Sequence, residues 1–275
     1  MSPYLLDLGF IKIRWYSVLI LCAFIIGYFL VINRCKKKNI SISLINDMCF
    51  YLVIACLLGA RVYYCIFEWK YYINNPLDIF KIWEGGLAIH GGIIAGIIFI
   101  YFYSKKKNLK LLELLDIFAP ALVLGQAIGR WGNFFNKEAF GPFIDESNPL
   151  ILKQLHIPDF IINGMYINGT YINGIYFEPG YYHPTFFYES IGCLILFLII
   201  IFIRNIKNIK DGQICATYFI GYGIIRFLIE CLRQDPLKLF NIKVAQLVSI
   251  IMILIGIYLL IRPYIKLKKV KHLKK

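Results

Sequence analysis

The chain has 275 residues, of which 59% are hydrophobic and 17% charged, and its mean hydropathy is +0.66. Such a composition is far too apolar for a soluble domain of this length, so it indicates a polytopic membrane protein. The formal net charge of +14 does not indicate nucleic acid, because the Lys and Arg residues form short clusters between apolar runs instead of one basic face. We therefore expect a membrane as partner and no nucleic acid.

Seven apolar segments are long enough to cross a hydrocarbon core of ~30 Å as helices, which takes about 20 residues, with ~17 tolerated. They lie at about 15–32, 44–67, 87–103, 109–129, 186–203, 213–232 and 244–262. The first run has no small-x-small cleavage site, so we expect a retained span and not a signal peptide. The sequence predicts an all-α polytopic protein with seven transmembrane helices in a single membrane-embedded domain, residues 1–275.

Basic clusters follow the first, third, fifth and seventh of these segments, at 34–38, 105–110, 204–210 and 262–275. Loops rich in Lys and Arg stay in the cytoplasm. We therefore expect the N-terminus outside and the C-terminus in the cytoplasm. The odd number of spans agrees with this orientation.

The largest stretch without an apolar run, about 130–185, then lies outside and forms an extracytoplasmic head between spans four and five. Asn-Gly recurs there at 163–164, 168–169 and 173–174. Asn-Gly favours tight turns, and the residues between the pairs favour strands, so we expect a small β-hairpin head. An insertion without chemistry is the other interpretation of the repeat.

Several polar residues fall at the outer ends of the predicted spans, where an ionisable cluster marks a functional site by default. They are Tyr16, Arg61, His90, Arg130, Asn133, His183, Tyr188 and Glu189. On the sixth segment, Tyr222, Arg226, Glu230 and Arg233 are spaced by four, four and three residues and share one helical face. Ion pairs within that helix are the alternative explanation of the stripe.

His90 and Asp116 are less distinctive. His90 is either a hydrogen-bond donor in helix packing or a base, and Gly91 and Gly92 after it allow a backbone or a ligand to approach closely. Asp116, in the inner half of the fourth segment, is expected to be structural.

Arginines at the outer leaflet suit an anionic headgroup, because the guanidinium binds phosphate as a planar fork and keeps its charge near lipid. The histidines at 90, 156, 183 and 272 are scattered, so we expect no metal site and no cofactor. The rival interpretation is a small transporter or channel for an anionic solute or lipid, which requires polar groups at the midplane and on both sides. The inner halves are nearly all apolar, which favours an enzyme.

Residues 129–141 read Gly-Arg-Trp-Gly-Asn-Phe-Phe-Asn-Lys-Glu-Ala-Phe-Gly. This segment resembles, position for position, the signature Gly-Arg-x-Gly-Asn-Phe-x-Asn-x-Glu-x-x-Gly of the prolipoprotein diacylglyceryl transferases. The resemblance implies a transferase of the bacterial cytoplasmic membrane, with its site facing the outer leaflet. Such an enzyme moves the diacylglyceryl group of phosphatidylglycerol to the lipobox cysteine thiol that follows a prolipoprotein signal peptide and releases glycerol phosphate, the first step of lipoprotein maturation.

The resemblance also implies roles for individual residues. His90 matches the histidine of the family's His-Gly-Gly and is the candidate base. Arg226 is the candidate partner of the leaving phosphate, and Glu230 is its orienting counter-charge. The remaining candidates bind substrate: Arg130, which is also a catalytic candidate, Asn133, Glu138, Tyr16, Tyr222 and Arg233.

The chain departs from the family pattern at two places. Ser17 stands where the family commonly has Gly, and Phe186 and Phe187 replace a usual polar residue and Leu at the entrance to the fifth span.

Overall fold

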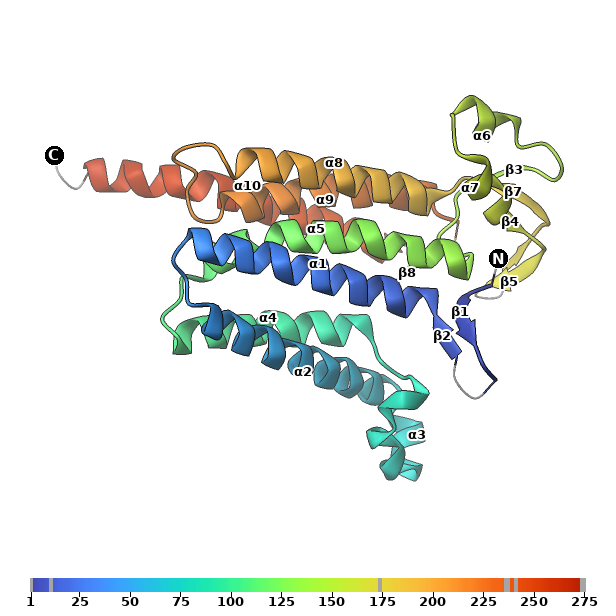
Figure 1. The fold of residues 1–275 in the computed structure, drawn as a ribbon, viewed down its shortest axis with the longest axis horizontal. Coiled ribbons are helices and arrows are strands. Elements are labelled where there is room, and N and C mark those ends of the chain that lie inside the picture. Colours follow the sequence, from blue (N-terminus) through green and yellow to red (C-terminus); the bar gives the residue numbers. More distant parts are fainter. Residues whose placement is uncertain (1, 10–11, 173–174, 235–237, 240–241, 273–275) are drawn as a thin grey trace. The chain divides into compact units, whose positions relative to one another are not determined.

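The computed structural model describes the chain except residues 1, 10–11, 173–174, 235–237, 240–241 and 273–275 (Figure 1). Two compact units result: residues Met1–Val31 with Leu115–Lys275, and residues Ile32–Leu114. The units are described in turn.

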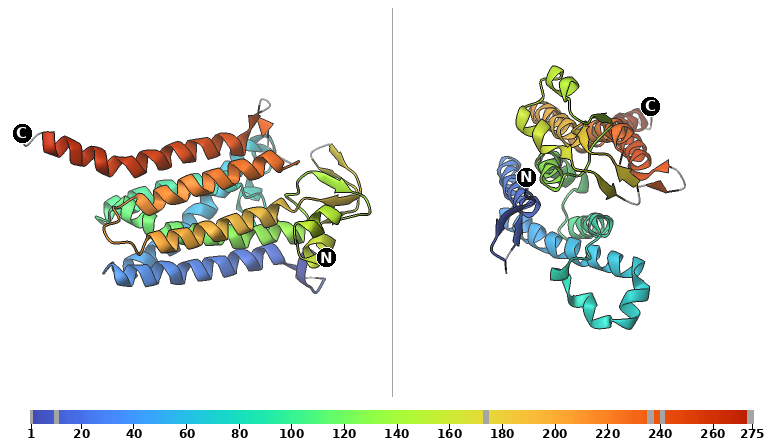
Figure 2. Two further views of the ribbon diagram at one scale, coloured as in Figure 1. Left: turned by 90° about the horizontal axis from the view of Figure 1, so that it is seen from above. Right: turned by 90° about the vertical axis from the view of Figure 1, so that its right-hand side faces the viewer.

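The first unit is built on long helices. They are α1 (Trp15–Lys37) and α5 (Leu111–Asn136), each of which continues into the second unit at one end, with α8 (Thr185–Ile203), α9 (Gln213–Leu232) and α10 (Val244–His272). Helix α9 packs against both α8 and α10, and these three helices run along the direction of α5 (Figures 1 and 2). Two short antiparallel pairs accompany them: β1 (Tyr4–Asp7) with β2 (Lys12–Arg14), and β8 (Lys238–Leu239) with β9 (Ile242–Lys243).

Between α5 and α8 the chain forms the head. It contains helices α6 (Leu150–Gln154) and α7 (Asp159–Gly164) and the strands β3 (Phe143–Asp145), β4 (Tyr166–Ile167), β5 (Thr170–Ile172), β6 (Ile175–Phe177) and β7 (Gly180–Tyr182). Strand β7 lies between β3 and β4 in one antiparallel sheet, and β5 pairs with β6 as a separate antiparallel pair.

The Asn-Gly pairs have three different outcomes. Gly169 has a φ of +71° and joins β4 to β5, as expected of a tight turn. The turn predicted at 163–164 is wrong, because these residues end α7, whose Ile161 and Ile162 are fully buried and hold the segment helical. The pair at 173–174 lies outside the described residues.

An aromatic core fixes the head to the ends of α5 and α8. Phe134 of α5 and Phe186 of α8 stack with ring centroids 5.1 Å apart, and both are buried with Phe140, Leu152 and Met165 of the head. Edge-to-face and offset ring pairs of this kind add to the burial of apolar area. Phe186, which departs from the family pattern, is thus a core residue of the head.

The second unit pairs α2 (Ile42–Phe67) with α4 (Ile89–Lys106). Between them lie α3 (Trp69–Asn74) and two 3-10 turns, η1 (Pro76–Phe80) and η2 (Ile82–Glu84). The two long helices approach closely through glycine: a Cβ on Gly91 would overlap the carbonyl of Gly59, and a Cβ on Gly59 would lie 2.7 Å from the Gly91 carbonyl oxygen. Small residues permit such contact between membrane helices.

Six described helices are long and apolar enough to cross a membrane, namely α1, α2, α5, α8, α9 and the first part of α10 (Val244–Pro263). The chain is therefore mostly helical and consistent with a polytopic membrane protein. The third predicted span corresponds to α4, which is a helix of 18 residues. Its hydropathy is reduced by His90 at one end and by Lys105 and Lys106 at the other, so it is not among the six.

Asp116 of α5 closes the start of α9. Its Oδ2 accepts a hydrogen bond from the backbone N–H of Gly212 at 2.7 Å, and its Oδ1 accepts one from Cys215 at 2.8 Å. A carboxylate at a helix N-terminus satisfies amides that have no partner within the helix and interacts favourably with the helix dipole. Asp116 has the structural role that the sequence predicts.

Replacement of Asp116 should destabilise the fold. We expect Asp116→Ala to cost ~1.5–3 kcal/mol, the usual range for hydrogen bonds to a charged group, because it leaves buried amides unpaired. The measurement is the thermal unfolding midpoint of the purified protein in detergent. The control is Glu113→Gln on the same helix, whose carboxylate forms a partly exposed ion pair with Lys38. Equal midpoints for the two variants would contradict the capping role.

Candidate active site

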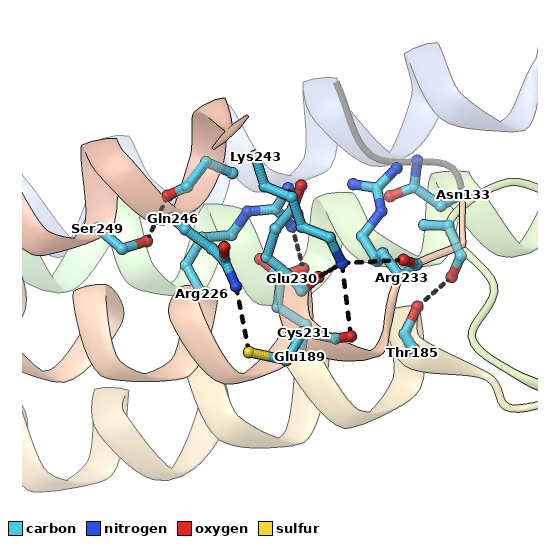
Figure 3. Close-up of polar contacts among 12 residues, drawn as sticks. Asn133, Thr185, Glu189, Arg226, Glu230, Cys231, Arg233, Lys243, Gln246 and Ser249 are labelled. Atoms are coloured by element: carbon cyan, nitrogen blue, oxygen red, sulfur yellow. Dashed lines mark hydrogen bonds and ion pairs between the residues drawn. The ribbon is translucent and has the colours of Figure 1, made fainter. Parts of the chain in front are cut away.

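A buried carboxylate from α8 joins two arginines from two other helices. The side chain of Glu189 is 1% exposed. Its Oε1 lies 2.9 Å from Nη2 of Arg130 on α5, and its Oε2 lies 3.1 Å from Nη1 of Arg226 on α9. Figure 3 shows Glu189 beneath Arg226 and Glu230. Because a buried charge is costly unless it is paired, these three groups hold one another in place.

The stripe predicted on the sixth segment belongs to this cluster. Arg226 Nη2 lies 2.8 Å from Oε2 of Glu230 one turn along α9, and the Tyr222 hydroxyl donates to Glu189 Oε1 at 3.3 Å. Both explanations of the stripe therefore apply: Arg226 and Glu230 pair within α9, and the stripe also meets Arg130 of α5 through Glu189. Arg233 is the C-cap of α9: its N–H still bonds to the carbonyl of Ile229 at 3.1 Å, and its ψ of 135° ends the helix directly after it.

Lysine 243 fixes the end of α9 beside the cluster. Its ammonium donates to the backbone carbonyl of Glu230 at 2.7 Å and to that of Arg233 at 3.4 Å (Figure 3). A cation bonded to the last carbonyls of a helix is favourable, since these carbonyls accept no hydrogen bond from within the helix. Lys243 thereby positions the turn that carries Glu230.

The polar residues of the 129–141 signature connect to Arg130 in sequence. Arg130 Nη1 donates to the Asn133 side-chain oxygen at 3.3 Å, and the Asn133 amide donates to Glu138 at 3.3 Å. Helix α5 ends at Asn136. Directly after it, Lys137 and Ala139 have φ values of 53° and 57°, and the Glu138 N–H bonds to the Asn133 carbonyl at 2.9 Å. This tight exit brings Glu138 back to the helix end.

The second glycine of the signature, Gly132, permits close packing against α1. A Cβ on Gly132 would overlap the ring of Tyr16, and the neighbouring Trp15 stacks on Phe135 with centroids 4.8 Å apart. Gly132 therefore admits the Tyr16 ring against the last turns of α5. Tyr16 lies beside the helix that carries Arg130.

His90 belongs to the second unit, and the structure leaves its prediction as a base untested. It is exposed in the first turn of α4, with its ring centroid 6.2 Å from that of Tyr63. The next residue, Gly91, contacts the backbone of α2, so in this structure it serves helix packing.

Glu189 is the site residue to which the sequence analysis assigned no role. Its signal was present: a carboxylate near the start of an apolar run, at the same predicted depth as two arginines. Nearby, His183 Nδ1 lies 3.0 Å from the Tyr188 hydroxyl, and burial lowers the pKa of His183, which favours the neutral imidazole.

Comparison with known proteins assigns the chain to a family. The family model described as prolipoprotein diacylglyceryl transferase matches residues 3–262. The chain belongs to this family. A phosphatidylglycerol--prolipoprotein diacylglyceryl transferase of Staphylococcus aureus (strain Newman) is 44% identical over 266 residues, which cover 96% of this chain and 90% of the relative. Proteins of the same name from Staphylococcus xylosus and Staphylococcus carnosus are each 41% identical over 272 residues, covering 98% of this chain and 92% and 94% of theirs.

In this diacylglyceryl transferase family member, the cations of the cluster are more accessible than its carboxylates. The Arg130 and Arg226 side chains are 22% and 14% exposed, whereas Glu189 and Glu230 are each 1% exposed. Two Arg and two Glu balance in charge, and each guanidinium has five N–H donors, more than these contacts use. In the part of the chain that the structure describes, no group of three or more His, Cys, Asp or Glu is placed to hold a metal ion.

We call the ion pairs of Glu189 with Arg130 and Arg226 the bridge. Substitutions of its members should have strongly coupled effects on stability. We expect Glu189→Gln and Arg226→Gln each to lower the unfolding midpoint in detergent markedly, since removing one partner of a buried pair costs about 3–5 kcal/mol. The double variant should lose less than the sum of the two. The matched cycle is Asp7→Asn with Lys12→Gln, an exposed pair 3.5 Å apart, which should show no measurable coupling. Additive losses at Glu189 and Arg226 would contradict the bridge.

Proposed function

We propose that the chain transfers the diacylglyceryl group of phosphatidylglycerol to the thiol of a prolipoprotein's lipobox cysteine and releases glycerol phosphate. The relatives are named for this reaction, and they align with nearly the full length of the chain. The observation that supports it most directly is the pair of partly exposed arginine side chains, Arg130 and Arg226, held on one buried carboxylate. This arrangement suits a phosphodiester anion at the end of a helical bundle.

The reaction is a displacement at carbon. The cysteine sulfur forms a bond to the glyceryl carbon that carries the phosphate ester, and the bond from that carbon to the phosphate oxygen breaks. The phosphate leaves with the electron pair, and the thiol proton passes to a base. Because negative charge grows on the leaving phosphate, a cation already in place stabilises the transition state more than the ground state.

Residue roles follow from where the contacts lie. Arg226 takes the leaving phosphate, and Glu230 orients it through their 2.8 Å ion pair. Arg130 holds the headgroup, and Glu189 sets the distance between the two guanidiniums. The remaining substrate-binding residues of the proposal surround Arg130 or follow α9: Tyr16, Asn133, Glu138, Tyr222 and Arg233.

The proposed arrangement in the membrane follows the positive-inside rule. It has seven spans with α4 as the third, the N-terminus outside, the C-terminus in the cytoplasm, and a single catalytic domain over residues 1–275 that carries the head at 130–185. The site then faces the outer leaflet of the bacterial cytoplasmic membrane, where the thiol of a secreted substrate arrives. The reaction needs no metal and no cofactor.

A transporter is the weaker proposal, because the acids in the inner halves of the spans have structural contacts. Asp116 bonds to the start of α9, and Glu113 pairs with Lys38 at 2.8 Å. A transport path requires polar groups available along the whole crossing.

The proposal is tested by reconstituting the protein with phosphatidylglycerol and a lipobox peptide and measuring thioether formation by mass spectrometry. We expect transfer by the wild type, with or without chelator, and a loss of roughly 10²-fold or more in Arg130→Lys and Arg226→Lys, because Lys offers no planar fork to phosphate. Arg14→Lys, an exposed position of β2, is the control and should be silent. Absence of transfer by the wild type would sink the function, and normal turnover by both Lys variants would sink the guanidinium roles.

The base is tested at His90. His90→Gln keeps a hydrogen-bonding side chain and removes the titrating group. If His90 accepts the thiol proton, the rate should fall and its pH dependence should move to higher pH, toward the ~8.5 of a free thiol. Initial rates of both proteins between about pH 6 and 9 give the answer. A silent variant with an unchanged profile would reduce His90 to a packing residue.

A further inference from the structure

The segment between α2 and α4 exposes an unusual amount of apolar surface. We call residues 69–86, which comprise α3, η1, η2 and the two glycines after them, the arm. Leu77, Phe80 and Trp83 are 77%, 74% and 76% exposed. The other large apolar side chains exposed on the arm are Trp69, Tyr71, Ile73, Ile79 and Ile82. Large apolar side chains exposed together along one short segment indicate an interaction surface.

The arm is nevertheless ordered, because one arginine binds its backbone. Arg61, in the last two turns of α2, is 6% exposed. Its Nε donates to the carbonyl of Ile79 at 2.9 Å, and its Nη1 donates to those of Gly85 and Gly86 at 2.8 and 2.9 Å. Its Nη2 donates to the carbonyls of Asp78 and Lys81.

These bonds decide which environment the arm suits. Irregular backbone cannot lie against hydrocarbon unless its polar groups are satisfied within the protein. The Arg61 fork satisfies five carbonyls of a segment that has little regular structure of its own. A loop bathed in water needs no such buried donor.

The polar side chains of the arm also bond to one another. The Tyr71 hydroxyl donates to Asp78 at 2.6 Å, and Lys81 pairs with the same carboxylate at 2.7 Å. The arm thus presents apolar side chains outward and pairs Asp78 with Lys81, which suits a segment that lies in a membrane interface.

The position of the arm identifies its partner. It begins directly after α2, a candidate span whose last residues Ile66 and Phe67 are 63% and 70% exposed, and it ends before Ile89 of α4, which is 70% exposed. The apolar surface of the arm is therefore continuous with the lipid-facing surface of the helices at its two ends. Figures 1 and 2 show α3 leaving the α2–α4 pair sideways from its end.

We propose that the arm is an interfacial anchor that lies in the boundary between headgroups and acyl chains of one leaflet, held there by Arg61, with a phospholipid surface as its partner. Trp69 and Trp83 are its membrane-contacting aromatics, in keeping with the preference of Trp for this depth. The other two tryptophans differ: Trp131 packs among Phe134, Phe160 and Phe186 in the head, and Trp15 stacks on Phe135. The inference rests on the membrane position of α2 and not on the proposed reaction.

The test is tryptophan quenching in the full-length protein, reconstituted in phosphatidylcholine–phosphatidylglycerol vesicles with bromine on the upper acyl chain. We expect Trp69→Phe and Trp83→Phe each to remove part of the emission that bromolipid quenches. Trp131→Phe, the matched control in the head core, should leave that part intact. If the two arm variants keep the wild-type quenchable emission and acrylamide in the water quenches both tryptophans, the anchor is overturned. Protection from acrylamide only after a lipobox peptide is added would assign the arm to peptide docking instead, which also overturns it.

The role of Arg61 has its own variant. Arg61→Lys keeps the charge and loses the fork, so bromolipid quenching of Trp83 should decrease and acrylamide quenching should increase, while Arg14→Lys leaves both unchanged. Unaltered quenching in Arg61→Lys would show that the arm holds its depth without the hydrogen bonds from Arg61, which would overturn the role of Arg61. The substitutions are conservative, and retention of the helical circular dichroism signal identifies any variant that has not folded.

Discussion

The first unit depends on one carboxylate. Glu189 is 1% exposed, and its two oxygens bind Arg130 and Arg226 from different helices. Without it, two cations would face each other at the end of a largely apolar bundle, where repulsion is weakly screened. With it, α5, α8 and α9 must meet at one register. The same group meets the structural requirement for neutral charge and sets the spacing of the two guanidiniums in the proposed site.

The surroundings of the bridge limit how it can move. The aromatic core of the head, with Phe134 and Phe186 stacked, fixes the end of α5 against the start of α8. Gly132 admits Tyr16, which brings α1 against the same end of α5. At the opposite end of α9, Asp116 fixes the first turn through two backbone amides. The arginines therefore project from helices whose ends are held, which is how a site is preorganised.

Arginine has two different uses in this chain. Arg130 and Arg226 are paired with carboxylates, remain partly exposed and have unused donors, so they suit an incoming anion. Arg61 is buried and donates its guanidinium N–H groups to backbone carbonyls, so it holds a segment of the fold. The difference lies in the acceptors: carboxylates leave a cation at the surface of a site, whereas carbonyls fully enclose it. The sequence places all three arginines at the ends of predicted spans and does not distinguish their two roles.

The sequence by itself determined the membrane class, the family and most helices, because hydrocarbon demands long apolar runs and the signature at 129–141 is dense in unusual residues. It also determined that Tyr222, Arg226 and Glu230 share a face, since helical periodicity depends only on spacing. Tertiary structure decided what periodicity does not encode: that Glu189 joins the arginines, that Arg61 serves the arm, that α7 replaces a turn at 163–164 and that α9 ends at its C-cap, Arg233. Each of these depends on a partner distant in the chain or on where an element ends, and a charged side chain has the same local signature whether its partner is a carboxylate, a carbonyl or a ligand.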